Sequence, residues 1–409
     1  MRNLIALSIM LFLVTLTFGV MSYNRGMKAD VNGDHYIYWK AGKDFLSGQK
    51  IYTPGLVDGG FTYPPFAAFC FSLFALLPFH SSAFIFTFLI NWGLWLPSFL
   101  LVRKVMQLEF PNQDLKWPLL IAAALSAGFY WHNYIWMNAN LPVFCLTLLG
   151  ILAFQTGHYR RSYLFLWAAT FLKVTPILFL FFFAIKRGPR DWVWIAICSL
   201  PFILLPFMIR GYEAGTADWQ EYIAAFMAPF ADGKIDENII SLGIPAVLRK
   251  LVSGNPAAGI APVFLLEADL LQTVVHILQL ASMALLTCKF LYDRYVKDRQ
   301  RFSAADLCLI FLVPLLLPGR VWAHHHVVTA FIYTYLCYVL IRQQRMALLS
   351  VLILLAMFSN LITSDVIGQQ ATDLLKHAGY VTWLMIGACL LVVMTGYQRH
   401  DRTGYTSSS

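Results

Sequence analysis

The sequence predicts an all-α polytopic membrane protein, and this prediction comes from composition and from the spacing of apolar runs. Hydrophobic residues make up 59% of the chain and charged residues 12%, against roughly 45–50% and about 25% in soluble domains. Apolar runs of membrane-spanning length recur from Leu4 to Met394, and short polar or basic segments separate them. The pattern excludes a soluble fold and predicts one membrane domain over residues 1–398, with about 10 to 13 transmembrane helices.

The first apolar run, residues 4–20, follows Arg2 and has two interpretations. It has the length of a signal peptide, but no small-residue cleavage site precedes Tyr23 and further spans follow it. We therefore expect it to be the first transmembrane helix. The seven cysteines lie mostly inside apolar runs without CxxC or metal-ligand spacing, which favours a packing role.

Basic clusters predict how the chain is oriented. Lysine and arginine in short loops mark the cytoplasmic side, so the net charge of +9 indicates topology rather than a nucleic-acid partner. The clusters lie at residues 103–104, 160–161, 186–190, 289–301, 342–345 and 399–402. The tail 399–409 is then cytoplasmic, and the opposite face carries the polar segments 23–62, 132–139, 210–258 and 364–378. We expect an inner (plasma) membrane protein whose site faces the periplasm or exterior.

Two segments break the simple alternation of crossings. Residues 162–185 have the length of one span, but Lys173 and Pro176 stand near the middle, where proline ends a helix and a cation is costly. We expect a broken hairpin with Lys173 at its tip; a side chain that snorkels to the interface is the alternative. The aromatic-rich run 61–79 is expected to form a helix lying at the outer interface.

Polar residues on the predicted outer face are candidates for chemistry. Asp34 follows the first helix and suits a general base held against a membrane site, or an ordinary cap of the helix that starts at His35. Arg320, His324 and His325 stand at an outer helix boundary, where they can hydrogen-bond a phosphate or a phenolic-type leaving oxygen. No HExxH motif or Cys/His partner set accompanies them, so we predict neither metal nor cofactor.

Two further outer segments carry residues with two interpretations each. Asn138 and Asn140 lie near a turn, where their amides can bind sugar hydroxyls or simply form the turn. Arg249 and Lys250 form a basic pair in the long segment 210–258. This pair points to anion binding or to an ordinary long loop, which the charge rule does not govern.

The order of several short motifs resembles one enzyme family. These motifs are Asp34-His35-Tyr36-Ile37-Tyr38, Ala41-Gly42, Leu46, Gly48, Tyr52, Tyr63-Pro64-Pro65, Lys173-Val174-Thr175-Pro176, Asn238 with Ser241-Leu242 and Arg249, and Trp322-Ala323-His324-His325. The set is similar to that of glycosyltransferase family 87, the polyprenol-phosphate-mannose-dependent mannosyltransferases of the glycosyltransferase C superfamily, over about residues 1–340. Met137-Asn138-Ala139-Asn140 stands where the family usually has Gly-Gln-x-Asn, and Val321 where Ser is common.

The resemblance implies a GT-C-type fold with a long first outer loop, 23–62, that carries the catalytic residue. It implies inverting transfer of a hexose, mannose above all, from a polyprenyl-phosphate sugar to a hydroxyl of a lipid or glycan acceptor. Asp34 is the implied general base. The implied donor-phosphate partners are Lys173, Arg320, His324, His325 and Arg249, and the implied sugar or acceptor contacts are Asn138, Asn140, Asn238, Tyr38, Tyr63 and Trp322.

Other classes of function stay open at this point. A secondary transporter also uses intramembrane charge and broken helices, but it calls for inverted repeats, and the sequence has no convincing internal symmetry. A related enzyme that moves glucose or aminoarabinose, and a polymerising or flippase-like partner in envelope assembly, are further alternatives. The long first loop favours an enzyme over a flippase.

Overall fold

The computed structural model describes residues 16–28, 33–53, 60–228, 238, 240–254 and 260–397. Every regular element in this part of the chain is a helix, which confirms the all-α prediction. The start of the helix expected over 4–20, and the tail 399–409, lie outside the described residues. The chain divides into two compact units, which we describe separately.

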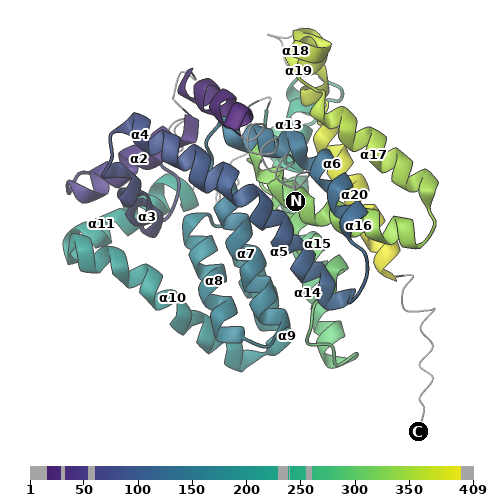
Figure 1. Cartoon of the computed structure of the whole chain (residues 1–409), viewed down its shortest axis with the longest axis horizontal. Helices are drawn as coiled ribbons and strands as arrows, with labels where there is room; N and C mark the ends of the chain where they lie inside the picture. Colours follow the sequence, from purple (N-terminus) through teal and green to yellow (C-terminus); the bar gives the residue numbers. More distant parts are fainter. Residues whose placement is uncertain are drawn as a thin grey trace, which may run out of the picture. The chain divides into compact units, whose positions relative to one another are not determined.

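Unit 1 consists of residues 1–101, 130–184 and 188–232. Its helices are α2 (Gly33–Leu46), α3 (Pro65–Ala75), α4 (Phe79–Ile85), the π-helix η1 (Phe86–Trp92), α7 (Asn140–Gln155), α8 (Tyr159–Leu172), α10 (Pro189–Arg210), α11 (Tyr212–Tyr222) and the π-helix η2 (Ile223–Met227) (Figure 1). Within it, α3 packs against α2, α8 and α10, and α8 packs against α7 and α10. Three helices contribute residues to both units: α5 (Gly93–Glu109), α6 (Lys116–Ile135) and α9 (Ile177–Arg187).

Unit 2 consists of residues 102–129, 185–187 and 233–409. Its helices are α13 (Ile244–Ser253), α14 (Ala268–Tyr295), α15 (Ala304–Leu316), the 3-10 helix η4 (Ala323–Val328), α16 (Thr329–Arg342), α17 (Met346–Asn360), α18 (Ser364–Ile367), α19 (Gln369–His377) and α20 (Tyr380–Tyr397). Within this unit, α20 packs against α15, α16, α17 and α19.

Length and hydropathy identify the candidate membrane spans. Among the described residues, Phe79–Glu109, Pro189–Arg210 and Ala268–Tyr295 are long and apolar enough to cross a membrane. The bent pair α19 and α20 adds a fourth candidate if it counts as one span. Shorter apolar helices, among them α7 and α15, do not reach that length alone. The chain is therefore a membrane protein, and the count of 10 to 13 spans stays a prediction.

The helix expected to break near Lys173 does break there. Helix α8 ends at Leu172 and α9 begins at Ile177. Tyr163, close to the start of α8, donates a hydrogen bond of 2.5 Å to Asp191 in the first turn of α10. The chain therefore returns, by the start of α10, to the start of α8, and Lys173 stands at the break between α8 and α9.

Residues 61–79 do not form one continuous helix. Helix α3 covers 11 of them, which at 1.5 Å per residue gives about 16 Å, half of what a crossing needs. Pro64 and Pro65 set its start, because proline suits the first helical turn where its missing N–H is not needed. The placement of α3 at the outer interface stays a prediction.

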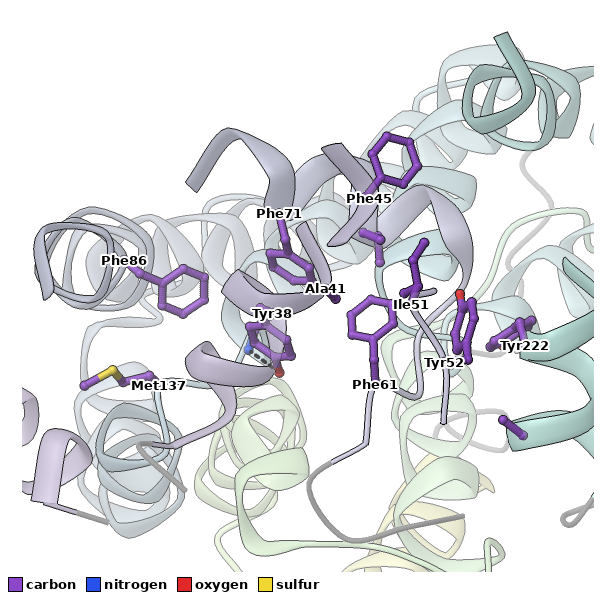
Figure 2. Packing of buried hydrophobic residues seen from close by; sticks show 14 of the residues in the cluster. Tyr38, Ala41, Phe45, Ile51, Tyr52, Phe61, Phe71, Phe86, Met137 and Tyr222 are labelled. Atoms are coloured by element: carbon purple, nitrogen blue, oxygen red, sulfur yellow. Dashed lines mark hydrogen bonds between the residues drawn. The ribbon is translucent and has the colours of Figure 1, made fainter. Parts of the chain in front are cut away.

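Aromatic side chains bind α2 to α3 and form the core of unit 1 (Figure 2). The ring of Tyr38 stacks on that of Phe71, with centroids 4.3 Å apart and an angle of 6° between the planes. Gly42 permits this close packing, because a Cβ there would lie 2.6 Å from the backbone of Phe71. The Ala41-Gly42 motif therefore fits a helix contact that larger side chains would force apart.

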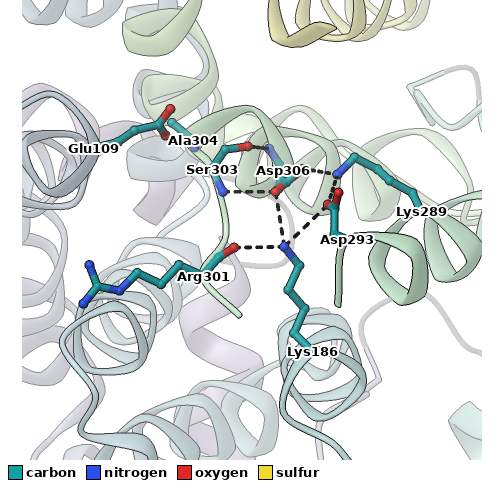
Figure 3. A network of polar contacts seen from close by, with 8 residues as sticks. All are labelled: Glu109, Lys186, Lys289, Asp293, Arg301, Ser303, Ala304 and Asp306. Atoms are coloured by element: carbon teal, nitrogen blue, oxygen red, sulfur yellow. Dashed lines mark hydrogen bonds and ion pairs between the residues drawn. The ribbon is translucent and has the colours of Figure 1, made fainter. Parts of the chain in front are cut away.

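A network of opposite charges joins three helix ends in unit 2 (Figure 3). The Lys186 ammonium is 1% exposed, donates to the Arg301 carbonyl at 2.9 Å, and lies 3.6 Å from both Asp293 and Asp306. Lys289 bonds the same two carboxylates. Asp306 also forms a capping box at the start of α15, so the network fixes where that helix begins.

Candidate active site

The first turn of α2 is tied to the turn between α6 and α7, and this places Asp34. The Asp34 amide donates to the Trp136 carbonyl at 2.8 Å. Gly33 before it has φ of +66°, and a Cβ at that position would lie 2.9 Å from the same carbonyl oxygen. Glycine is favoured there for both reasons. The Asp34 carboxylate is consequently held against the α6–α7 turn.

Two asparagines connect Asp34 to Lys173. Asn138 donates through its amide nitrogen to an oxygen of the Asp34 carboxylate. The Asn138 side-chain oxygen accepts the backbone N–H of Asn140 at 3.1 Å, and the Asn140 side-chain oxygen accepts from the Lys173 ammonium at 2.6 Å. An anion and a cation from distant segments are thus joined by a continuous hydrogen-bonded path.

Burial differs along this path. Asn138 is 1% and Asn140 6% exposed, whereas Asp34 and Lys173 are both partly exposed. The buried asparagines thus bond two residues that are only partly buried. Asn138 and Asn140 therefore bond the two charged residues, and their expected contact with sugar hydroxyls stays a prediction.

Tyr38 and Tyr63 form an aromatic wall beside these groups. Their hydroxyls lie 3.0 Å apart, and the Tyr63 ring centroid is 5.9 Å from the Lys173 ammonium. Burial raises the pKa of Tyr38 well above its usual value, and interaction with Tyr63 and with the charge of Asp34 acts in the same direction. Tyr38 therefore stays protonated at neutral pH.

His35 anchors α2 directly behind Asp34. Its ring is buried, stacks on Phe86 with centroids 4.5 Å apart, and has Nε2 2.8 Å from the Ser82 hydroxyl. Burial lowers the pKa of His35 to about 3, so the ring is neutral at neutral pH. His35 holds the helix in place and does not supply a charge.

The segment before η4 in unit 2 carries the second group of predicted residues. Val321 is fully buried and bonds both ways to the chain before α13: its N–H donates to the Ser241 hydroxyl at 3.1 Å, and its carbonyl accepts from Leu242 at 2.6 Å. This pairing fixes where the chain enters η4. Val321, which differs from the Ser common in the family, is therefore a packing residue here.

A run of ring contacts extends from Arg320, before Val321, to His325 after it. The Arg320 guanidinium lies 5.2 Å from the Trp322 ring centroid, Trp322 lies against His324 at 5.9 Å, and His324 contacts His325 at 4.9 Å. Arg320, Trp322 and His325 are partly exposed, whereas His324 is 4% exposed. Of the two imidazoles expected to face a phosphate, His325 is the more accessible.

Arg249 and Asn238 complete the predicted set, also in unit 2. Arg249 lies on α13 with a partly exposed side chain. Its neighbour Lys250 is buried and donates to the carbonyls of Ser241 and Lys376 at 2.8 and 2.9 Å, which is a structural role. The Asn238 side-chain oxygen accepts from the Ile240 amide at 3.1 Å, so it shapes the turn before Ser241.

The structure thus brings together Asp34, Tyr38, Tyr63, Asn138, Asn140 and Lys173 in unit 1, and Arg320, Trp322, His324 and His325 in unit 2. Among the described residues, no group of three or more His, Cys, Asp or Glu side chains is arranged to hold a metal ion. Sequence reasoning missed Asn91, a buried amide inside a candidate span. Its signal was a polar side chain in the middle of an apolar run.

Comparison with known proteins identifies a family. The sequence profile described as glycosyltransferase family 87 matches residues 61–318, more than half of the chain. No curated protein matches the chain. The matched range includes Lys173, Asn138 and Asn140, and it ends shortly before Arg320.

Proposed function

The chain belongs to glycosyltransferase family 87 and is a membrane glycosyltransferase; from that premise we propose that its donor is a polyprenyl-phosphate hexose, with mannose the first sugar to test. The acceptor is a hydroxyl group of a lipid or glycan on the outer face. The fold is of the GT-C type, and transfer inverts the anomeric configuration. No nucleotide sugar, metal or cofactor takes part in this proposal.

The path from Asp34 to Lys173 is the observation that supports this proposal most. Asp34 takes the proton from the acceptor hydroxyl, whose oxygen then attacks the anomeric carbon of the donor sugar. The bond between that carbon and the phosphate oxygen breaks, and polyprenyl phosphate leaves with the electron pair. Lys173 compensates the negative charge that develops on the leaving phosphate. A partly exposed aspartate and a partly exposed lysine, each bonded to a buried asparagine, suit these two tasks.

The unit 2 residues keep their predicted roles as proposals. Arg320 and His325 suit a phosphate oxygen, because one is a permanent cation and the other has an accessible imidazole. His324 and Arg249 are assigned to the same phosphate contact. Trp322 and Asn238 are assigned to sugar or acceptor contact. In unit 1, Tyr38 and Tyr63 are assigned to sugar or acceptor contact as well.

The distribution of basic residues supports an outward-facing site. Arg160 and Arg161 stand at the start of α8, and Lys173 follows its end after 14 helical residues, about 21 Å away. Lysine and arginine in short loops favour the cytoplasmic side. Lys173, and with it Asp34, then lies toward the outer face of an inner (plasma) membrane.

Donor turnover tests the proposed function directly. Purified protein in liposomes is given polyprenyl-phosphate mannose with a radiolabelled sugar and an extract of lipid and glycan acceptors, and release of polyprenyl phosphate is followed. We expect Asp34→Asn to lower the rate by about 100-fold or more while donor binding persists. Asp44→Asn, on the same helix but bonded to the exposed Lys40, is the matched control and keeps full activity.

Two other outcomes contradict the proposal in different ways. If Asp34→Asn and the wild type turn over the donor at equal rates, Asp34 is not the general base, but the proposed donor class is supported. If the wild type consumes neither mannose, glucose nor aminoarabinose polyprenyl phosphates, the donor class is wrong, and transport assays in the same liposomes follow.

A further inference from the structure

The hydrogen-bonded path that reaches Lys173 continues into the core of unit 1. The Asn140 amide nitrogen donates to the side-chain oxygen of Asn133 at 3.3 Å, and the Asn133 amide nitrogen donates to that of Asn91 at 3.1 Å. Asn133 lies on α6 and Asn91 in the π-helix η1. Three amides from three helices are therefore aligned behind one ammonium group.

The direction of these bonds follows from the lysine. An ammonium group only donates, so it requires the oxygen of the Asn140 amide. The nitrogen of that amide must then point away from Lys173, and it meets the oxygen of Asn133. Because the Asn133 oxygen accepts from Asn140, the Asn133 nitrogen must likewise point toward the oxygen of Asn91. Each bond polarises the next in a chain of this kind, which strengthens the contact at its charged end.

Packing alone gives no reason for these asparagines. Asn91 and Asn133 are fully buried, and Asn91 lies within a candidate membrane span. A buried amide is costly unless its polar atoms are paired, and the nitrogen of Asn91 has no hydrogen-bond partner among the described residues. The chain of amides therefore ends in an unsatisfied group, which apolar side chains of similar size would avoid. The π-helix that carries Asn91 is also a form that recurs at functional sites.

We infer that Asn133 and Asn91 are positioning residues that act through Asn140 on Lys173; this inference rests on the proposed function. They hold the Asn140 oxygen toward the ammonium group, and so hold the ammonium where the donor phosphate binds. The contact of Asn138 with Asp34 depends on the backbone N–H of Asn140 instead of its side chain. Loss of Asn133 should therefore disturb the donor side of the site and spare the base.

A double-mutant cycle with Lys173 tests the inference. Asn133→Leu, Lys173→Met and the double variant are reconstituted in liposomes, and KM for polyprenyl-phosphate mannose and kcat are measured. A hydrogen bond to a charged group contributes about 1.5–3 kcal/mol, which corresponds to about 10- to 100-fold. Because Asn140 stays present, we expect Asn133→Leu to raise the donor KM by about 3- to 30-fold with little change in kcat. In the Lys173→Met background, the same substitution should change KM by less than about twofold.

A matched control separates positioning from stability. Thr147, buried on α7 of the same unit, bonds the Val143 carbonyl of its own helix at 2.8 Å. Thr147→Val should leave the donor KM unchanged in both backgrounds. If Asn133→Leu does not fold, Asn91→Leu, one step farther from Lys173, enters the same cycle with an expected rise of about 2- to 5-fold.

The outcomes distinguish this inference from the proposed function. The inference is overturned if Asn133→Leu raises the donor KM equally with and without Lys173, or if it lowers kcat at constant KM. In either case the proposed function stands as long as the wild type turns over the donor. A wild type that neither turns over the donor nor binds polyprenyl phosphate overturns the function, and the inference falls with it.

Discussion

The hydroxyl groups of Tyr38 and Tyr63 lie 3.0 Å apart, although one residue belongs to α2 and the other precedes α3. Tyr52 donates in addition to the Tyr63 carbonyl at 2.7 Å, so both ends of this tyrosine are fixed. The Tyr63 ring faces the Lys173 ammonium at 5.9 Å. Tyr38, Tyr52 and Tyr63 are thus joined by hydrogen bonds beside the lysine.

This arrangement gives a prediction about the Tyr63 ring and its hydroxyl. A cation near an aromatic face contributes about 0.5–2 kcal/mol, which corresponds to about 2- to 30-fold. Tyr63→Phe keeps the ring and should retain most of the activity, whereas Tyr63→Leu should raise the donor KM within that range. Steady-state kinetics in liposomes measure the difference; equal effects from the two substitutions would assign the role to the hydroxyl.

Gly42 leads to a prediction about stability. A Cβ there meets the Phe71 backbone at 2.6 Å, so Gly42→Ala must push α2 away from α3 at a cost of about 1–3 kcal/mol. We expect a lower apparent melting temperature in detergent. Gly387 on α20 has nothing within 4 Å of such a Cβ, and Gly387→Ala is the control that should melt as the wild type does.

The charge network of unit 2 gives a second stability prediction. Lys186→Met removes one of two lysines that face Asp293 and Asp306, and breaking a buried ion pair costs about 3–5 kcal/mol. The apparent melting temperature should fall clearly. Lys40→Met removes an ammonium that is 58% exposed and should have little effect. Equal shifts for the two variants would contradict a structural role for the buried network.

His35 predicts a pH dependence of stability. Its pKa is lowered by burial to about 3 in the folded protein and is about 6.5 when unfolded, so the unfolded state binds more protons between these values. The contribution of His35 to the free energy of unfolding is fully present above pH 6.5, and it falls by about 1.4 kcal/mol per pH unit as the pH drops toward 3. His35→Phe should show a shallower decline in melting temperature between pH 7 and 4.5. An unchanged decline would assign the acid sensitivity to other groups.

Orientation is tested by labelling single cysteines with a membrane-impermeant maleimide. The background is Cys288→Ser, because Cys288 is the exposed cysteine among the described residues. Ser47→Cys, in the turn after α2, should react from outside in sealed right-side-out vesicles. Thr156→Cys, at the exposed turn between α7 and α8, should react only after permeabilisation. The reverse pattern would place the site in the cytoplasm.

The sequence predicts the helical break better than it predicts the contacts of the site. Lysine and proline in the middle of an apolar run predict that the helix is interrupted there, because each opposes a continuous buried helix. Nothing local in the sequence says that the Asn140 oxygen meets Lys173, 33 residues away, or that Lys186 meets the Arg301 carbonyl, 115 residues away. Such pairs depend on how helices pack, and a single sequence does not record that.

The burial of Asn91 and Asn133 was hidden for a related reason. Whether it stands in an apolar run, as Asn91 does, or in a short polar segment, as Asn133 does, an asparagine looks the same in the sequence whether it faces a lumen, a lipid or another amide. Only the packed structure shows that the two side chains meet at 3.1 Å. The charged residues Asp34 and Lys173, in contrast, were identifiable because charge is rare in this chain.

The contact between Tyr163 and Asp191 has a consequence for how the polypeptide is threaded during synthesis. Since the chain returns, by the start of α10, to the start of α8, helices α8 and α9 together add either no crossing or two. With an even number, the orientation of the helices that follow does not depend on how deeply α8 and α9 insert. We expect a change in the length of these two helices to alter the depth of Lys173 without inverting the helices that follow.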